Sequence, residues 1–251
     1  NGSGNNLVSW NWRAGSTSGI ATNGSTTITP TAYSFNQTSG FSIIKYTGNG
    51  TNGAKLPHGL GAEPHFVLVR CTNLTNEPWQ VYFKYLGNTK RLFLNLTNAE
   101  TSATEWNSTT PDTVNVTLGN GTHINSSGNT FIAYCFAPIN GFSKFGNVKG
   151  NNSTDGKYVH LGFKPDFILF KDKANAGSNW VIHDSKRNPG NPVDKELKPS
   201  SGSAEGTSTL VDFYSTGFKV RANLGTSVDF VWAAFAEEPL VSSNGVPATA
   251  R

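Results

Sequence analysis

The sequence contains no methionine and only two cysteines. Because methionine is absent, Asn1 is not a translation start, and we expect a processed chain or a fragment of a longer protein. Two cysteines cannot supply the disulfide framework that stabilises many small secreted domains. Cys71 and Cys135 lie within apolar runs. This position favours buried thiols over a disulfide.

Charged residues and long apolar runs are also scarce. Charged side chains make up 14% of the chain, and the net charge of +4 comes from basic residues that are scattered singly. Binding to nucleic acid requires clustered basic residues, so we expect no nucleic-acid partner. No apolar run approaches the roughly 18 residues of a membrane span, so we expect no membrane insertion. The polar, weakly charged composition favours a virion-surface or extracellular location.

Strand and turn patterns occupy most of the chain. Glycine accounts for 27 of the 251 residues, and Asn-Gly and similar pairs separate short apolar runs. Val114, Val116 and Leu118 alternate with polar residues, which predicts a strand with one buried and one solvated face. Long helical periodicity is absent, and the best helical candidate is a turn or two at 194–197. The sequence therefore predicts an all-β fold, with sandwich-like units favoured over a barrel.

One segment of roughly 100 residues occurs twice. The stretch GFSIIKYTGNGTNG from Gly40 returns as GFSKFGNVKGNNSTDG from Gly141, at an offset of 101 residues. Further matching segments, at offsets of 101, 101 and 99 residues, are 64–69 with 165–170, 79–82 with 180–183, and 131–137 with 230–236. Landmarks in one order at a nearly constant offset predict two tandem antiparallel β-sandwich-like repeats.

The repeats define the expected domain boundaries. We place an N-terminal strand and polar linker at 1–39, the first β repeat at 40–140, the second at 141–240, and a C-terminal tail at 241–251. Apolar runs that follow a proline, as at 66–69 and 167–170, predict strands buried on both faces or in a sandwich core. We also expect Trp79 to be equivalent to Trp180 and Phe66 to Phe167, with both aromatic pairs largely buried.

The N-terminal stretch 8–14 resembles the strand that closes each repeat, with Trp12 in the place of Phe136 and Phe235. It is predicted to be an orphan strand at the start of the chain. Because unpaired backbone groups are costly, we expect it to add to a sheet edge of its own chain or of a neighbouring subunit. Pairing within its own chain is slightly favoured, because the linker before Gly40 is long enough to span a domain.

Metal-binding and phosphate-binding motifs are not evident. His160 and the pair His183-Asp184 could converge on a metal, but lone histidines beside strands are more often core or surface residues. The glycine-rich stretches lack the Lys-Ser/Thr of a phosphate loop and a following helix, so they are interpreted as turns. We expect neither a metal nor a cofactor.

The 16 carboxylates could in principle include a glycosidase pair. Glu237 and Glu238 follow a closing strand, and Asp194 and Glu196 lie in a polar loop, where solvated charge is the usual reading. Neither pair recurs in the first repeat. We therefore expect no enzymatic activity and assign no catalytic residue, and the ligand-binding residues remain unknown from the sequence.

Trp106, Tyr82 and Tyr85 are the aromatic residues that could stack on a pyranose, although Trp106 could equally cap the end of a sandwich. Twelve N-x-S/T sequons also occur, all before residue 155, and we interpret them as turn chemistry rather than glycosylation sites. The sequon asparagines are Asn1, Asn23, Asn36, Asn49, Asn73, Asn95, Asn107, Asn115, Asn120, Asn125, Asn151 and Asn152.

A family resemblance extends over nearly the whole chain, from about Val8 to Leu240, and its motifs lie mainly in the second half. FIAYCFAPINGFSKFG, GNNSTDG, PDFILFK, NWVIHDSKRNPGNPVD, STGFKVR and FVWAAFAEEP resemble an uncharacterised duplicated β-domain of virion structural and tail-fibre-like proteins of marine phages, particularly cyanophages. The resemblance implies a place on a virion surface, fibre or appendage, and it supplies no catalytic residues.

Two main functions remain open at this point. The first is a non-enzymatic structural protein of a virion or extracellular fibre, of the tail-fibre, head-fibre or decoration type. Such a protein would assemble with copies of itself or other fibre proteins through sheet edges and loops. The alternative is a lectin-like module that recognises glycans on the host surface. A glycan-degrading appendage enzyme is a weaker third option.

Overall fold

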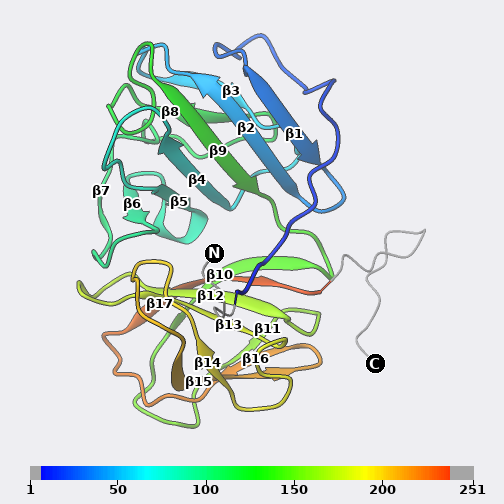
Figure 1. Cartoon of the computed structure of the whole chain (residues 1–251), viewed down its shortest axis with the longest axis vertical. Helices are drawn as coiled ribbons and strands as arrows, with labels where there is room; N and C mark the ends of the chain where they lie inside the picture. Colours follow the sequence, from blue (N-terminus) through cyan, green and yellow to red (C-terminus); the bar gives the residue numbers. More distant parts are fainter. Residues whose placement is uncertain (1–6, 238–251) are drawn as a thin grey trace.

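The computed structural model describes residues 7–237, and almost all of its regular structure is β-strand. The exception is one 3₁₀ turn, η1 (Lys84–Leu86). The all-β prediction is therefore confirmed. Figure 1 shows the strands gathered in an upper and a lower unit. Within the described range, no helix has the length and hydropathy required to cross a bilayer.

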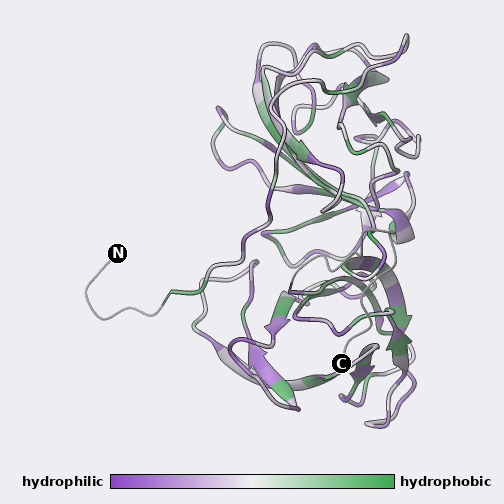
Figure 2. Ribbon diagram, turned by 90° about the vertical axis from the view of Figure 1, so that its right-hand side faces the viewer, coloured by the Kyte–Doolittle hydropathy of each residue, from purple (hydrophilic) through white to green (hydrophobic). Residues whose placement is uncertain are grey.

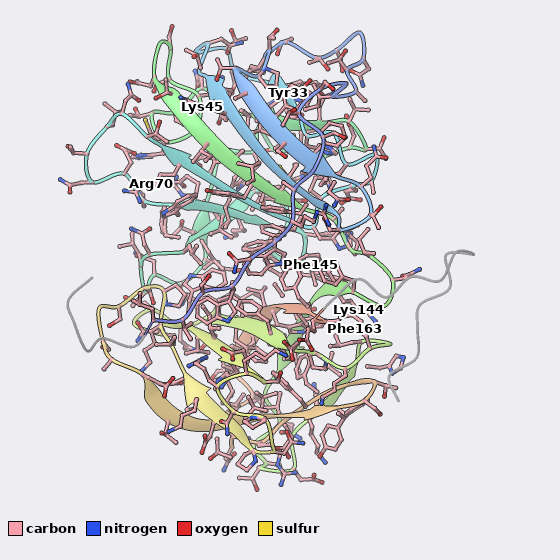
Figure 3. The ribbon with its side chains drawn as sticks, turned by 45° about the vertical axis from the view of Figure 1, so that its right-hand side comes forward. Tyr33, Lys45, Arg70, Lys144, Phe145 and Phe163 are labelled. Carbon is pink, nitrogen blue, oxygen red and sulfur yellow. The ribbon has the colours of Figure 1, made fainter. Side chains whose placement is uncertain are left out.

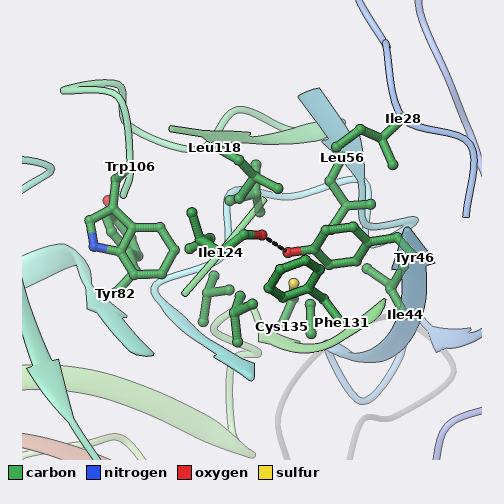
Figure 4. Close-up of a cluster of buried hydrophobic side chains, with 14 of the residues drawn as sticks. Ile28, Ile44, Tyr46, Leu56, Tyr82, Trp106, Leu118, Ile124, Phe131 and Cys135 are labelled. Carbon is green, nitrogen blue, oxygen red and sulfur yellow. Dashed lines mark hydrogen bonds between the residues drawn. The ribbon is translucent and has the colours of Figure 1, made fainter. Parts of the chain in front are cut away.

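The upper unit is a sandwich of two antiparallel sheets. Its strands are β1 (Ala32–Asn36), β2 (Phe41–Thr47), β3 (Ala54–Pro57), β4 (Phe66–Cys71), β5 (Gln80–Phe83), β6 (Lys90–Phe93), β7 (Thr101–Ser102), β8 (Asn115–Leu118) and β9 (Thr130–Phe136). The larger sheet has the order β1-β2-β9-β4-β5-β6-β7, and β3 pairs with β8 in a smaller sheet. Apolar side chains of both sheets fill the space between them (Figure 4). Tyr46 donates a hydrogen bond to the Ile124 carbonyl within this core, at 2.6 Å.

The lower unit is a second sandwich. Its strands are β10 (Ser143–Lys149), β11 (Tyr158–His160), β12 (Phe167–Asp172), β13 (Trp180–Asp184), β14 (Val193–Glu196), β15 (Gly206–Tyr214), β16 (Gly217–Val220) and β17 (Asp229–Phe235). They form the sheets β10-β17-β12-β13 and β11-β16-β15-β14. The predicted helical turn at 194–197 is wrong. Residues 194–196 belong to β14, which pairs with β15 because Val193 packs into the core, and Leu197 forms a β-bridge with Ile182.

The two units share one strand order. In the upper unit β2-β9-β4-β5 form the centre of the large sheet, and in the lower unit β10-β17-β12-β13 follow in the same sequence. The smaller pair β3-β8 likewise corresponds to β11-β16. Phe66 lies opposite Phe136 and Phe167 lies opposite Phe235, so the central register is also the same.

The turn that begins each repeat needs glycine. Gly40 and Gly141 have φ values of 62° and 75°, a backbone conformation that L side chains rarely adopt. At Gly40 a Cβ atom would lie 2.4 Å from the Ala137 carbonyl oxygen. The repeated GFS sequence therefore marks a turn with a positive φ in both repeats, and at Gly40 the chain also passes too closely for a side chain.

The larger sheets of the two units pack against each other. In β4, Val67 and Val69 point into the sandwich core of the upper unit, whereas Phe66 and Leu68 point toward the lower unit. The buried residues of this inter-unit core are Phe41, Phe66, Val81, Phe83, Leu92, Phe136, Phe142, Phe145, Leu169, Trp180, Ile182, Val231, Ala233 and Phe235. The molecule is thus four layers of sheet, which explains strands that are apolar on both faces. In Figure 2 the strands carry most of the hydrophobic colour.

The equivalent tryptophans differ in burial, so the expectation that both are largely buried is wrong for one of them. Trp180 is fully buried, and its indole N–H donates to the Phe93 carbonyl in the upper unit at 2.8 Å. Trp79 is only half-buried, and its ring lies 5.6 Å from the ring of Tyr134. Phe167 is also half-buried, unlike Phe66. The difference arises because Trp180 inserts beneath β6 of the other unit, whereas nothing equivalent covers Trp79.

The N-terminal segment 7–15 is not a strand, contrary to the orphan-strand prediction. The edge of β2 to which such a strand could add is occupied by β1, and β1 lies in the stretch predicted as a linker. Side chains make the contacts instead. Trp12 lies edge-on to Phe136, Phe167 and Phe235, with centroid distances of 5.9, 5.4 and 5.2 Å. The segment therefore docks within its own chain, across both units, as the blue trace in Figure 1 shows.

We expect Trp12→Ala to lower the free energy of unfolding by about 2 kcal/mol, because a half-buried aromatic ring leaves the contact between the units. Urea denaturation monitored by circular dichroism measures this change. Leu7→Ala is the control, since Leu7 is 71% exposed and should have no effect. Equal stabilities of the Trp12→Ala protein and the unchanged chain would contradict a structural role for this segment.

Two of the three polar residues of the predicted strand at 113–118, Asn115 and Thr117, are not solvated, and only Thr113 is exposed. All four residues of β8 are buried, including Asn115 and Thr117. The Asn115 amide oxygen accepts a hydrogen bond from Thr26 at 2.9 Å, and its nitrogen donates to Asn23 at 3.1 Å. The stretch before β1 therefore covers this face of the upper unit. Alternation correctly predicted the strand, but the second face is buried by a distant polar segment.

Candidate functional site

The aromatic residues predicted to stack on a sugar have different environments. Trp106 is buried in the core of the upper unit, edge-on to the equally buried Tyr82 at 5.6 Å (Figure 4). Neither ring can reach a ligand at the surface, so their assignment as stacking residues is wrong. Tyr85, which is 43% exposed, is the remaining candidate.

The histidines considered for metal binding do not meet. His160 is exposed on β11, whereas His183 is completely buried on β13 beside the Phe170 ring. Burial lowers the pKa of His183 to about 4, so it is neutral at physiological pH. Across residues 7–237 no three His, Cys, Asp or Glu side chains gather in an arrangement able to hold a metal ion.

The carboxylates considered for catalysis lie at the end of the chain's last described strand and in β14, which contains both Asp194 and Glu196. Glu237 is exposed and paired with Lys186, and Glu238 lies outside the described residues. Glu196 on β14 is paired with Lys198 at 2.9 Å. Each of these described carboxylates is therefore engaged with a neighbouring cation.

Cys71 and Cys135 are free and buried, as predicted. Cys71 lies opposite Phe131 in the β4–β9 ladder, whereas Cys135 lies opposite Val67. The two cysteines are thus four positions apart along the ladder, beyond the reach of a disulfide. Burial raises the pKa of the Cys135 thiol to about 12, so it is not a thiolate nucleophile at neutral pH.

Two exposed tyrosines lie together on the outer face of the lower unit. Tyr158 on β11 and Tyr214 on β15 are 46% and 40% exposed, and their ring centroids are 5.9 Å apart. The Tyr158 hydroxyl is 2.7 Å from that of Thr216. Between them lies Gly217, where a Cβ would meet the Val159 carbonyl oxygen at 2.1 Å and the Tyr158 ring at 3.0 Å. Glycine therefore allows the Tyr158 ring to lie across the sheet.

Charged side chains border this tyrosine pair. Arg221 is paired with Asp212 at 3.3 Å, and Lys219 is paired with Asp155. Aromatic rings offer an apolar surface, while paired charges at the rim offer hydrogen-bond donors and acceptors. This combination suits a ligand with both apolar and hydroxylated surfaces. Sequence reasoning missed the pair, because the only local signal was a single tyrosine in each of two strands.

A small pocket lies where the two units meet, with a volume of about 180 Å³. Tyr85 and His65 line it from the upper unit. Lys144, Phe145 and Phe163, labelled in Figure 3, line it from the lower unit. Burial and the nearby Lys84 cation lower the pKa of His65. Charge and an exposed ring meet here, but the pocket has room only for a small group.

A wide cleft of about 820 Å³ lies beside the N-terminal segment. Amides and hydroxyls of 11–16 and 36–39 make up most of its lining, together with Arg13 and Glu237. The cleft is therefore wide, but its lining contains neither an exposed aromatic pair nor a cluster of ionisable groups.

Two of the sequon asparagines are fully buried. Asn115 is held by Asn23 and Thr26, and the Asn125 amide donates to the Asn49 side chain and to the Thr51 carbonyl, both at 3.0 Å. A glycan at either position would displace these contacts. The amides at these two sequons connect loops, which agrees with their interpretation as turn residues rather than glycosylation sites.

The fold and these sites define a double β-sandwich protein with candidate binding surfaces at the tyrosine pair and at the junction of the units. The chain belongs to the family described as "Domain of unknown function (DUF7483)", whose model matches residues 1–239. No curated protein and no solved structure matches it. The family match spans the N-terminal segment and both repeats, so the duplicated body as a whole is what the family shares.

Proposed function

We propose that this chain is a non-enzymatic structural module of a virion surface or extracellular fibre, which assembles with copies of itself or other fibre proteins through sheet edges and loops. The observation that carries the proposal is the inter-unit core. It makes the two sandwiches one four-layered body, and such a body suits a rigid building unit.

The N-terminal segment supports the same role. Trp10 donates to Asp184 in the lower unit at 3.2 Å. Farther along the chain, Ser16 exchanges two backbone hydrogen bonds with Phe35 of the upper unit, at 2.8 and 3.0 Å. The segment therefore joins both units on one side and opposes their separation. The low charge and the virion-type resemblance of the repeats are consistent with a fibre or decoration protein.

Assembly is tested by sedimentation velocity over a wide range of protein concentration. A structural module is expected to form defined oligomers whose proportion rises with concentration. A single monomeric species at every concentration, together with no binding to other proteins of the same particle, would contradict the proposal.

The tyrosine pair favours a second candidate, a lectin-like module that recognises a host-surface glycan. Aromatic rings beside hydroxyl and charged groups form a surface on which a pyranose can stack. A glycan array with the full chain tests this candidate, and Tyr214→Ala should abolish any signal while Tyr85→Ala retains it. A signal that depends on Tyr85 instead would move the site to the junction pocket.

A further inference from the structure

The outer edge of β11 has unpaired backbone groups. Val220 N–H donates to the Lys157 carbonyl at 3.1 Å, and Leu161 N–H donates to the Thr216 carbonyl at 2.8 Å. Because bonded and non-bonded pairs alternate in an antiparallel ladder, Val159 bonds to β16 and Tyr158 faces the other way. Within the described residues, neither the Tyr158 N–H nor its carbonyl has a hydrogen-bond partner.

In the upper unit the equivalent edge is occupied. Lys55 of β3 also directs its backbone away from its partner strand, as the bond from His58 N–H to the Val114 carbonyl establishes. The Lys55 carbonyl accepts hydrogen bonds from Thr27 N–H at 3.1 Å and Ile28 N–H at 3.0 Å. Lys55 N–H donates to the Thr27 hydroxyl at 2.8 Å. The chain's own N-terminal stretch thus satisfies this edge.

Lys55 and Tyr158 hold the same place in the two repeats. Each precedes a residue that points into its sandwich core, Leu56 opposite Val116 and Val159 opposite Phe218. An open edge at β11 should leave its core residue more exposed than the equivalent residue of β3, and this is observed. Leu56 is 1% exposed, whereas Val159 is only partly buried. An occupant of the β11 edge would complete the cover over Val159.

We propose that the outer edge of β11 is a strand-docking site for an extended, uncharged Thr/Ser-rich segment of another polypeptide chain. The inference rests on the proposed assembly function and names the edge through which it occurs. The occupant's chemistry follows from the upper unit, where the stretch STTITP at 25–30 fills the same place. The segment comes from another chain because each molecule already uses its own copy at β3. Strand addition of this kind satisfies the edge by backbone hydrogen bonds.

The test is an NMR titration of the full ¹⁵N-labelled chain with the acetylated and amidated peptide NGSTTITP, which corresponds to residues 23–30. We expect saturable shifts of the amide signals at 157–161. A peptide with proline in place of both Thr27 and Ile28 lacks the two donors that bind Lys55, and it should cause no shifts. Shifts confined to the surroundings of Lys55, or no shifts from either peptide, would overturn the proposal.

Two substitutions at one position separate the edge from the tyrosine ring. Tyr158→Pro removes the outward N–H but spares the ladder with β16, so the fold should tolerate it. It should raise the Kd of the peptide at least about tenfold, as expected for a lost hydrogen bond and a steric block. Tyr158→Thr keeps the edge and removes the ring, and it should change the Kd less than about threefold. Equal losses in both variants would show that the tyrosine ring, and not the strand edge, binds the peptide, and would refute strand docking.

Sedimentation of the same variants distinguishes the two proposals. Oligomers that persist in Tyr158→Pro, with no peptide shifts in the unchanged chain, would leave the assembly function standing and reject this edge. Peptide binding by a chain that stays monomeric would support the edge and reject assembly between copies of this protein. If Tyr158→Pro fails to fold, the comparison of the two peptides still decides the matter.

Discussion

Trp180→Ala is expected to lower the free energy of unfolding by about 3 to 5 kcal/mol, the usual result of emptying a large buried aromatic site. Trp180 is fully buried in the inter-unit core, and its indole N–H bonds to the Phe93 carbonyl of the other unit. The substitution removes the ring and the shorter of two hydrogen bonds to that carbonyl, which keeps a bond of 3.4 Å from Leu96 N–H. Chemical denaturation followed by tryptophan fluorescence and circular dichroism measures the loss.

The duplication provides a matched control for this experiment. Trp79 occupies the equivalent place in the first repeat but is half-buried. Trp79→Ala should therefore cost only about 1 to 2 kcal/mol. Trp180→Phe retains most of the apolar contact and should fall between the two alanine variants. Equal losses for Trp79→Ala and Trp180→Ala would show that the inter-unit contact adds no stability.

Stability should also fall as the pH decreases through the range of histidine titration. Burial lowers the pKa values of His58 and His183 from 6.5 to about 4. The unfolded chain therefore binds protons at a higher pH than the folded one. The stabilisation is complete above pH 6.5 and is lost progressively as the pH falls toward 4. Each histidine contributes about 2 to 4 kcal/mol over this window.

Substitution separates the two histidines. Among residues 7–237, neither ring nitrogen of His183 makes a hydrogen bond of good geometry, although the backbone of Val193 and Lys195 lies beside the ring. His183→Phe should therefore flatten the pH dependence with little loss of stability at pH 7. His58 accepts from Leu60 N–H at 3.2 Å and contacts the Asp112 carbonyl at 3.1 Å, so His58→Phe should destabilise at every pH. His160→Gln, at an exposed position, is the control. A His183→Phe protein with the pH profile of the unchanged chain would contradict this assignment.

Part of the candidate surface was within reach of sequence reasoning. The repeat predicted two equivalent β-units, and the linker before Gly40 was recognised as polar, but the matched segments did not include β3 and β11. The pairing of that linker with β3, and the absence of a counterpart at β11, was not predictable. Hydrogen bonds between Thr27 and Lys55 connect residues 28 positions apart, and a polar linker sequence carries no signal for such a partner. Tyr158 and Tyr214 likewise meet only after β16 pairs with β11 on one side and with β15 on the other.

The sequence by itself determined the all-β fold, the duplicated strand order and the apolar strands at 66–69 and 167–170. These features follow from local alternation, turn residues and internal repetition. Only the tertiary structure decided which faces of the repeats meet, and therefore why Trp180 is buried while Trp79 is not. It also decided that 7–15 docks through its tryptophan side chains although its alternating pattern is that of a strand. The physical reason is that equivalent local sequences meet different neighbours, and burial depends on those neighbours.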